Sequence, residues 1–119
     1  MALSRCRRTQ PNVNKEPIIA IAKDKEQQMN QVYVYHKHDP FPEEMKNTVG
    51  YLVYNYMTGA ISSMLNTRLQ ELTQTATPPF INAGVEDNDF VLAKTKKAFM
   101  GVAICKDDGI ATGLSALMR

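Results

Sequence analysis

The sequence contains no tryptophan, only two cysteines and only two histidines among its 119 residues. The cysteines, Cys6 and Cys105, are too few and too differently placed to suggest a disulfide scaffold. No apolar run approaches the ~18 residues that span a bilayer, and the arginine-rich start is not followed by an apolar signal region. The net charge of +2 is small and comes largely from the N-terminus, unlike a continuous basic nucleic-acid footprint. We therefore expect one soluble domain at most, with neither a membrane nor a nucleic acid among its partners.

Catalytic motifs are also missing. The chain has no HExxH, HxxEH or GxSxG motif and no phosphate-binding glycine loop. Cys105 has no evident histidine base, which favours a small core residue over a nucleophile. The acidic run Glu86 to Asp89 lacks the spacing of a calcium loop and is more typical of a solvated turn. The sequence therefore predicts no catalytic residue in this chain.

The two histidines are the only weak metal candidates. His36 and His38 stand two apart on an expected strand, so their rings project from one face with Asp39 close by. A zinc site needs a third ligand and usually a fourth, and the chain has no other histidine. A solvated strand end is the favoured interpretation.

Apolar periodicity divides the chain into a leader and one α+β unit. Residues 1–16 are polar and have no hydrophobic period, so we expect a mobile linker or an expression scar there. The expected strands are residues 17–24, 31–39, 80–86 and 97–106, and the expected helices are residues 39–77 and 107–119. This order indicates an α+β fold, a largely antiparallel sheet with helices packed on one face.

The last helix should be capped by Asp107 or Asp108, and it reaches Arg119 without a C-terminal signal. We therefore expect a domain truncated in its last helix. Surface that a complete helix would cover should then promote homo-oligomers.

The long helical run has apolar residues at three-four spacing, typical of one continuous buried stripe. These residues are Met45, Val49, Leu52, Val53, Tyr56, Met57, Ala60, Ile61, Met64, Leu65, Leu69 and Leu72. Thr58 and Gly59 form a candidate break between two nearly collinear helices. Pro78 and Pro79 end the run, since proline cannot continue a helix and restricts the residue before it.

Arg68 lies in line with this stripe, and two interpretations of it stay open. In the first, Arg68 is structural, and backbone carbonyls or a carboxylate such as Glu71, Glu86 or Asp87 pin its guanidinium. In the second, its stem packs while its head reaches water.

Two stretches carry a resemblance to a known family. They are GAISSMLNTRLQELTQTATPPFINAG, residues 59–84, and FVLAKTKKAFMGVAICK, residues 90–106. Together they resemble the non-catalytic repeat domain of the pitrilysin/insulinase-type zinc metallopeptidases, in a bacterial branch. The matching positions are Ser62, Ser63, Thr67, Arg68, Leu69, Gln70, Glu71 and Leu72.

The resemblance implies a parent protein with two lobes, each built from two similar α+β domains, that close around a peptide. The zinc motif of the family lies in a different domain, so zinc belongs to the parent and this chain holds no cofactor. In the C-terminal lobe of the family an arginine and a tyrosine contact the substrate, but Thr73 and Phe80 stand at those positions here. Residues 17–119 therefore resemble a partial domain, the second of the N-terminal lobe.

The expected partners are the catalytic domain and the other lobe of the parent, and a peptide substrate through the parent. The resemblance implies a bacterial parent, periplasmic or cytoplasmic. Two alternatives stay open: an inactive family member, and a free-standing peptide- or protein-binding module.

Overall fold

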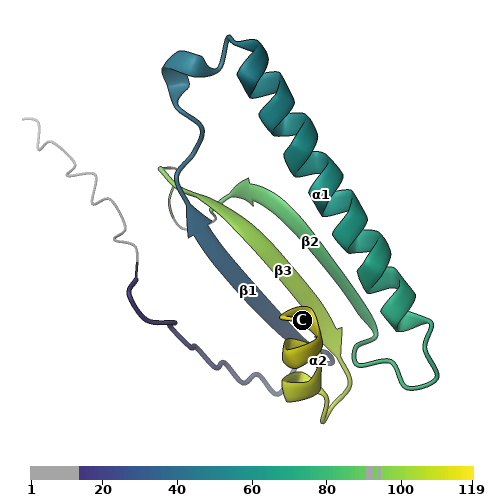
Figure 1. The fold of residues 1–119 in the computed structure, drawn as a ribbon. Helices are drawn as coiled ribbons and strands as arrows, with labels where there is room; N and C mark the ends of the chain where they lie inside the picture. The colour runs from purple at the N-terminus through teal and green to yellow at the C-terminus, as the bar shows by residue number, and fades with distance from the viewer. Residues whose placement is uncertain (1–13, 91–92, 94) are drawn as a thin grey trace, which may run out of the picture.

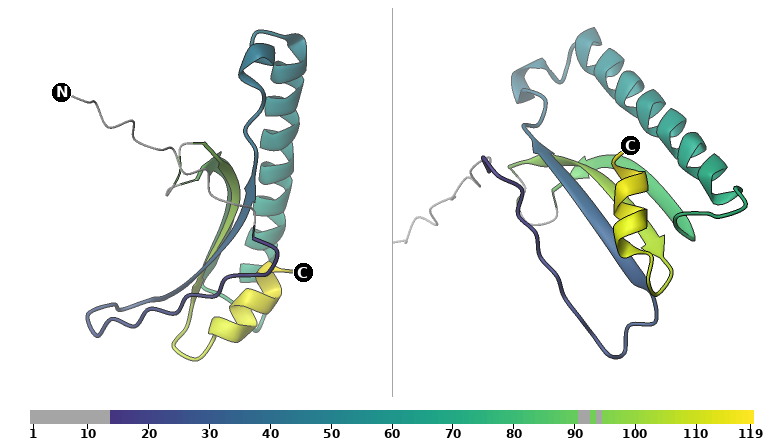
Figure 2. Two further views of the ribbon diagram at one scale, coloured as in Figure 1. Left: turned by 90° about the vertical axis from the view of Figure 1, so that its left-hand side faces the viewer. Right: turned by 60° about the horizontal axis from the view of Figure 1, so that its bottom comes forward.

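The computed structural model describes residues 14–90, 93 and 95–119 of the chain. Its elements are β1 (Asn30–His38), the 3-10 turn η1 (Glu43–Met45), α1 (Val49–Thr73), β2 (Asn82–Asp89), β3 (Lys97–Cys105) and α2 (Ile110–Leu117). The strands form one antiparallel sheet in the order β1-β3-β2, and both helices lie on the same side of it (Figures 1 and 2). The expected α+β class, with an antiparallel sheet and helices packed against it, is confirmed.

The two faces of the sheet follow from the alternation of side chains along each strand. On β1, Val32 is buried opposite Ala103 of β3, whereas the next residue, Tyr33, is half-exposed. The core lies between the helices and this covered face. It consists of Val32, Leu69, Phe80, Ala103 and Cys105. The opposite face, which carries Tyr33 and Tyr35, has no helix over it in the described ranges (Figure 2).

Helix α2 packs closely on the middle strand because two glycines remove side chains from the contact. A Cβ added to Gly113 would lie 2.2 Å from the Cys105 sulfur, and one added to Gly101 would lie 3.2 Å from a methyl group of Leu117. The first separation is far shorter than any tolerable contact, so only glycine at position 113 lets the α2 backbone approach β3 this closely.

Helix α1 is continuous, with no break at Thr58 and Gly59, and it begins later than expected. Thr48 has extended backbone angles (φ −109°, ψ 158°), which separate α1 from η1. Glu43 and Glu44 therefore lie in η1 and not in the first turn of α1. The N-terminal turns of α1 extend past the end of the sheet (Figure 1).

The prediction of a continuous buried stripe on α1 is wrong. Leu69 is the one buried residue of the helix, and most of the apolar positions are exposed. The side of α1 that faces the sheet is mixed, because Thr58, Ser62 and Asn66 lie there together with Leu69 and Leu72. We call the apolar side that points away from the sheet the outer face of α1. At about 100° of rotation per residue, it consists of Val49, Leu52, Val53, Tyr56, Met57 and Met64, whereas the exposed Ile61 and Leu65 lie on the flank toward the sheet.

Three further expectations are corrected. Residues 17–24 form no strand, and Ile18, Ile19 and Ile21 are exposed, because no neighbouring strand pairs with this segment in the described chain. The acidic run up to Asp89 is not a turn: it continues β2 because it pairs with β3. The residue preceding α2 is Gly109, which makes no side-chain cap. The expected leader lies mainly in residues 1–13, outside the described residues.

No helix in the described ranges is both long and apolar enough to cross a membrane.

Candidate functional site

Polar side chains gather at the end of the sheet where β1 ends and β3 begins. His38 and Asp87 lie on the covered face at the two outer strands, and β3 runs between them. The His38 Nε2 atom lies 2.7 Å from the Asp87 Oδ1 atom, and the His38 Nδ1 atom lies 2.9 Å from the backbone oxygen of Asp39. Only 6% of the Asp87 side chain is exposed. One imidazole therefore connects β1 to β2 across the middle strand.

Both ring nitrogens of His38 face groups that can only accept hydrogen bonds, a carboxylate and a carbonyl. A neutral imidazole has a single N–H and could make one of these bonds, so the geometry selects the imidazolium. Burial lowers the pKa of His38, but the hydrogen bond to Asp87, the bond to the Asp39 carbonyl and the charge of Asp87 raise it. The net result is a pKa above the ordinary value of 6.5, although Lys97 opposes it.

The metal interpretation of the histidine pair does not fit this arrangement. A metal needs an unprotonated ring nitrogen, and both nitrogens of His38 point at acceptors. His36 lies on the same face but is exposed. The Asp39 carboxylate, expected close to both rings, instead pairs with the ammonium of Lys96. Among the described residues, no group of three or more His, Cys, Asp or Glu side chains could hold a metal ion.

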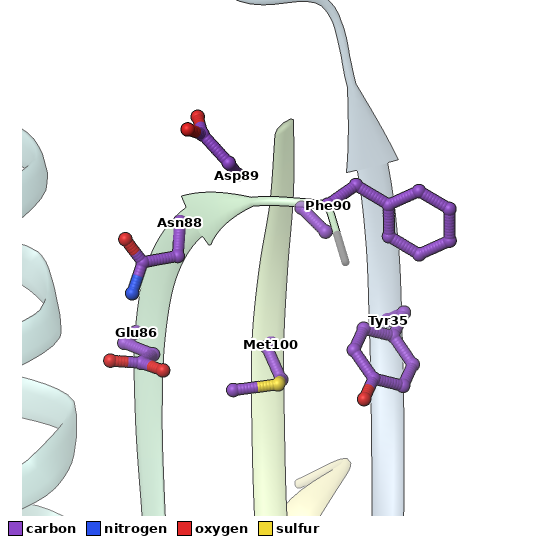
Figure 3. A pocket seen from close by; sticks show the side chains of 7 residues that line it. Tyr35, Glu86, Asn88, Asp89, Phe90 and Met100 are labelled. Carbon is purple, nitrogen blue, oxygen red and sulfur yellow. The ribbon is translucent and has the colours of Figure 1, made fainter. Parts of the chain in front are cut away.

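A shallow pocket of about 200 Å³ lies above β3 at the same end of the sheet, on the face that carries Tyr33 and Tyr35 and has no helix over it in the described ranges. Met100 of β3 forms its floor between Tyr35 and Glu86, and Tyr35 and Phe90 form an aromatic wall (Figure 3). The buried Ala98 lines the floor beside Met100. Their rings meet edge to face, with centroids 5.9 Å apart. Glu86 and Asn88 of β2 line the opposite side (Figure 3). The pocket thus has an apolar wall, an acidic wall and an apolar floor.

The aromatic wall continues along β1. Tyr33 stacks on Tyr35, with ring centroids 6.1 Å apart and planes within 10°. Lys37 places its ammonium 5.8 Å from the centre of the Phe90 ring. Because β1 pairs only with β3 in the described part of the chain, its other edge lies open beside this aromatic row.

The opposite edge of the sheet is covered by a side chain that sequence reasoning missed. The Asn66 amide donates to the Val85 backbone oxygen (2.9 Å), and the Val85 N–H donates to the Asn66 side-chain oxygen (2.7 Å). This pair copies the two hydrogen bonds of a neighbouring strand and anchors α1 to the edge of β2. The only signal in the sequence was an asparagine in the middle of a helix, a residue that usually needs a partner there.

Arg68 lies away from the sheet. Its side chain is 81% exposed, and its guanidinium contacts Glu71 one turn along α1, with 3.4 Å between the Nη1 and Oε2 atoms. Glu71 was one of the expected carboxylate partners, but the contact stays within the helix and reaches no strand. Of the two positions matched to substrate-contacting residues of the resembled family, Phe80 is fully buried. The other, Thr73, donates its hydroxyl to the Gln70 carbonyl.

Cys105 lies in the core, and burial raises the pKa of its thiol. A protonated, enclosed thiol is a poor nucleophile, which agrees with its expected role as a small core residue.

Comparison with protein-family models, with curated proteins and with solved structures returns no match for this chain.

Proposed function

We propose that the chain is a non-catalytic supporting domain of a zinc peptidase similar to the pitrilysin/insulinase family, where it forms part of the wall around a peptide. The proposal starts from the resemblance of residues 59–84 and 90–106. These stretches correspond to the C-terminal half of α1, the connection to β2, and β3. The named matching positions, Ser62 to Leu72, all lie on α1, and the two stretches together cover elements that contact one another in sequence, α1 with β2 and β2 with β3.

The open edge of β1 is the observation that carries the peptide-facing role. An extended peptide can add to a free sheet edge through backbone hydrogen bonds, and its alternate side chains then fall on one face of the sheet. Here that face presents Tyr33, Tyr35 and the pocket above β3. Aromatic rings supply contact area at a small entropic cost, and Glu86 would favour a basic or neutral side chain of the peptide.

Peptide cleavage belongs to another domain of the proposed parent, which supplies the zinc. No residue of this chain is assigned to zinc or to bond breaking, because both ring nitrogens of His38 already contact Asp87 and Asp39. Its contribution is to position and enclose the peptide.

A second candidate function is a free-standing protein-binding module, favoured by the outer face of α1, which exposes six large apolar side chains. The reading frame of the natural gene separates the candidates. An intact HxxEH motif upstream supports the active peptidase, a degenerate motif supports an inactive family member, and a frame without further family domains supports the free-standing module.

The peptide surface itself can be tested on this chain with short unstructured peptides and amide NMR. We expect shifts at Tyr33, Tyr35 and the other β1 amides, lost in a Tyr35→Lys variant. A Tyr56→Lys variant is the matched control, since Tyr56 is an exposed tyrosine on α1. Shifts confined to α1, or none at millimolar peptide, would refute the role of the β1 edge.

A further inference from the structure

The outer face of α1 is a large apolar surface that the fold leaves uncovered. Each of its six residues is exposed, led by Tyr56 at 78% and Val49 at 74%. The side of α1 that meets β2 includes Thr58, Ser62 and Asn66 beside Leu69 and Leu72, so the helix has apolar side chains on both sides. An ordinary surface helix carries one apolar stripe, which faces the core.

The area of this face is close to what a stable pair of subunits needs. Exposed side chains of this size each offer on the order of 100 Å², so the six together offer on the order of 600 Å². A standard protein interface buries about 800 Å² on each partner. The outer face therefore supplies most of one side of such an interface, and an identical surface would supply the other side.

The charge distribution makes the face compatible with a copy of itself. Residues 47–67 contain no charged side chain, and the nearest charges are Lys46 at one end and Arg68 at the other. Two such helices can meet along the whole apolar stretch without placing like charges opposite one another. Met57 and Met64 add flexible side chains that adapt to a second surface.

The middle of the helix permits close approach. Ala60 lies on the outer face between Tyr56 and Met64, four residues from each. In an antiparallel pair related by a two-fold axis near this point, the small Ala60 side chains of both copies meet, and the helix dipoles oppose. A two-fold contact is also closed, so association stops at two copies.

We propose that two copies of this chain associate through the outer faces of their α1 helices, antiparallel and with the two-fold axis near Ala60. The proposal does not rest on the proposed peptidase role, since it uses a different surface from the β1 edge. It also differs from association through surface left uncovered by α2, which is the expectation from the sequence alone.

Sedimentation velocity of the 119-residue chain over a concentration series tests the proposal. We expect a monomer–dimer equilibrium whose Kd rises about tenfold or more in a Tyr56→Glu/Met64→Glu variant, because charges would be buried at the centre of the contact. Circular dichroism should be unchanged, since both side chains are exposed. Asn55→Glu, an exposed position off the outer face, and Ile19→Glu, an exposed apolar position outside α1, are the matched controls and should leave Kd unchanged.

Cysteine cross-linking in a Cys6→Ser background tests the orientation. Ala60→Cys lies near the proposed axis and should form a disulfide with its own counterpart, whereas Val49→Cys, at the helix end, should not. A monomer at every concentration would overturn the proposal and leave the face to a different protein. A dimer that survives the double substitution, or that Ile19→Glu disrupts, would overturn it in favour of another surface.

Discussion

Removing the imidazole of His38 should destabilise the fold and abolish part of its pH dependence. In a His38→Ala variant, the Asp87 carboxylate, only 6% exposed in the wild-type fold, loses its partner, and the imidazole no longer joins β1 to β2. Leaving a buried charged group without its hydrogen bond costs about 1–3 kcal/mol. Since about a third of the His38 side chain is exposed, solvent screens the pair, and we expect the lower part of that range, about 1–2 kcal/mol.

The sign of the pH effect follows from the direction of the pKa shift. The pKa of His38 is higher in the folded chain than the ordinary 6.5, so folding favours the protonated ring. Its contribution is complete below pH 6.5 and is lost as the pH rises through the folded pKa. Wild-type stability should therefore fall between pH 6.5 and the folded pKa by an amount that the His38→Ala variant does not show.

Urea denaturation at a series of pH values measures both effects. His36→Ala is the matched control, because His36 is the other histidine and lies exposed on the same strand. A double-mutant cycle with Asp87→Asn should give a coupling energy of about 1 kcal/mol below pH 6.5, vanishing at high pH. Equal pH slopes for the wild type and the His38→Ala variant would refute the imidazolium argument.

Three other substitutions test the packing. Asn66→Ala removes both bonds to Val85 and should cost about 1–3 kcal/mol; hydrogen exchange of the Val85 amide should accelerate, and a protected amide would contradict the proposed edge cover. Gly113→Ala places a Cβ 2.2 Å from the Cys105 sulfur and should cost about 1–3 kcal/mol in thermal unfolding; Cys105→Ala should lessen that cost in the double variant, and a neutral Gly113→Ala would show that α2 shifts freely. Arg68→Ala should change stability by less than about 0.5 kcal/mol in urea, because its ion pair is exposed; a loss above about 1 kcal/mol would restore the idea of a pinned arginine.

Local signals in the sequence determined most of the elements but fewer of their contacts. Alternation along the strand expected at residues 31–39 puts Val32 and Tyr33 on opposite faces, and the structure buries the first and exposes the second, because the side-chain period of a strand is fixed by its backbone. Pro78 and Pro79 set only an outer limit for the long helix, which was expected to reach residue 77 and ends at Thr73. Residues 17–24 were wrongly predicted as a strand, because β-propensity describes how well a segment suits a sheet and does not provide a neighbouring strand to pair with.

Only the tertiary structure decided which side of α1 meets the sheet. Periodicity identified an apolar stripe, and the usual rule that such a stripe is buried then failed, since Asn66 and Leu69 set the orientation of the helix against β2. The same holds for His38 and Asp87, which are 49 residues apart in the chain and meet only because the sheet order places β3 between their strands. The sequence alone determined the residue types and their local periods, while long-range pairing determined which of them came together, because hydrogen bonds across a sheet depend on register and not on local propensity.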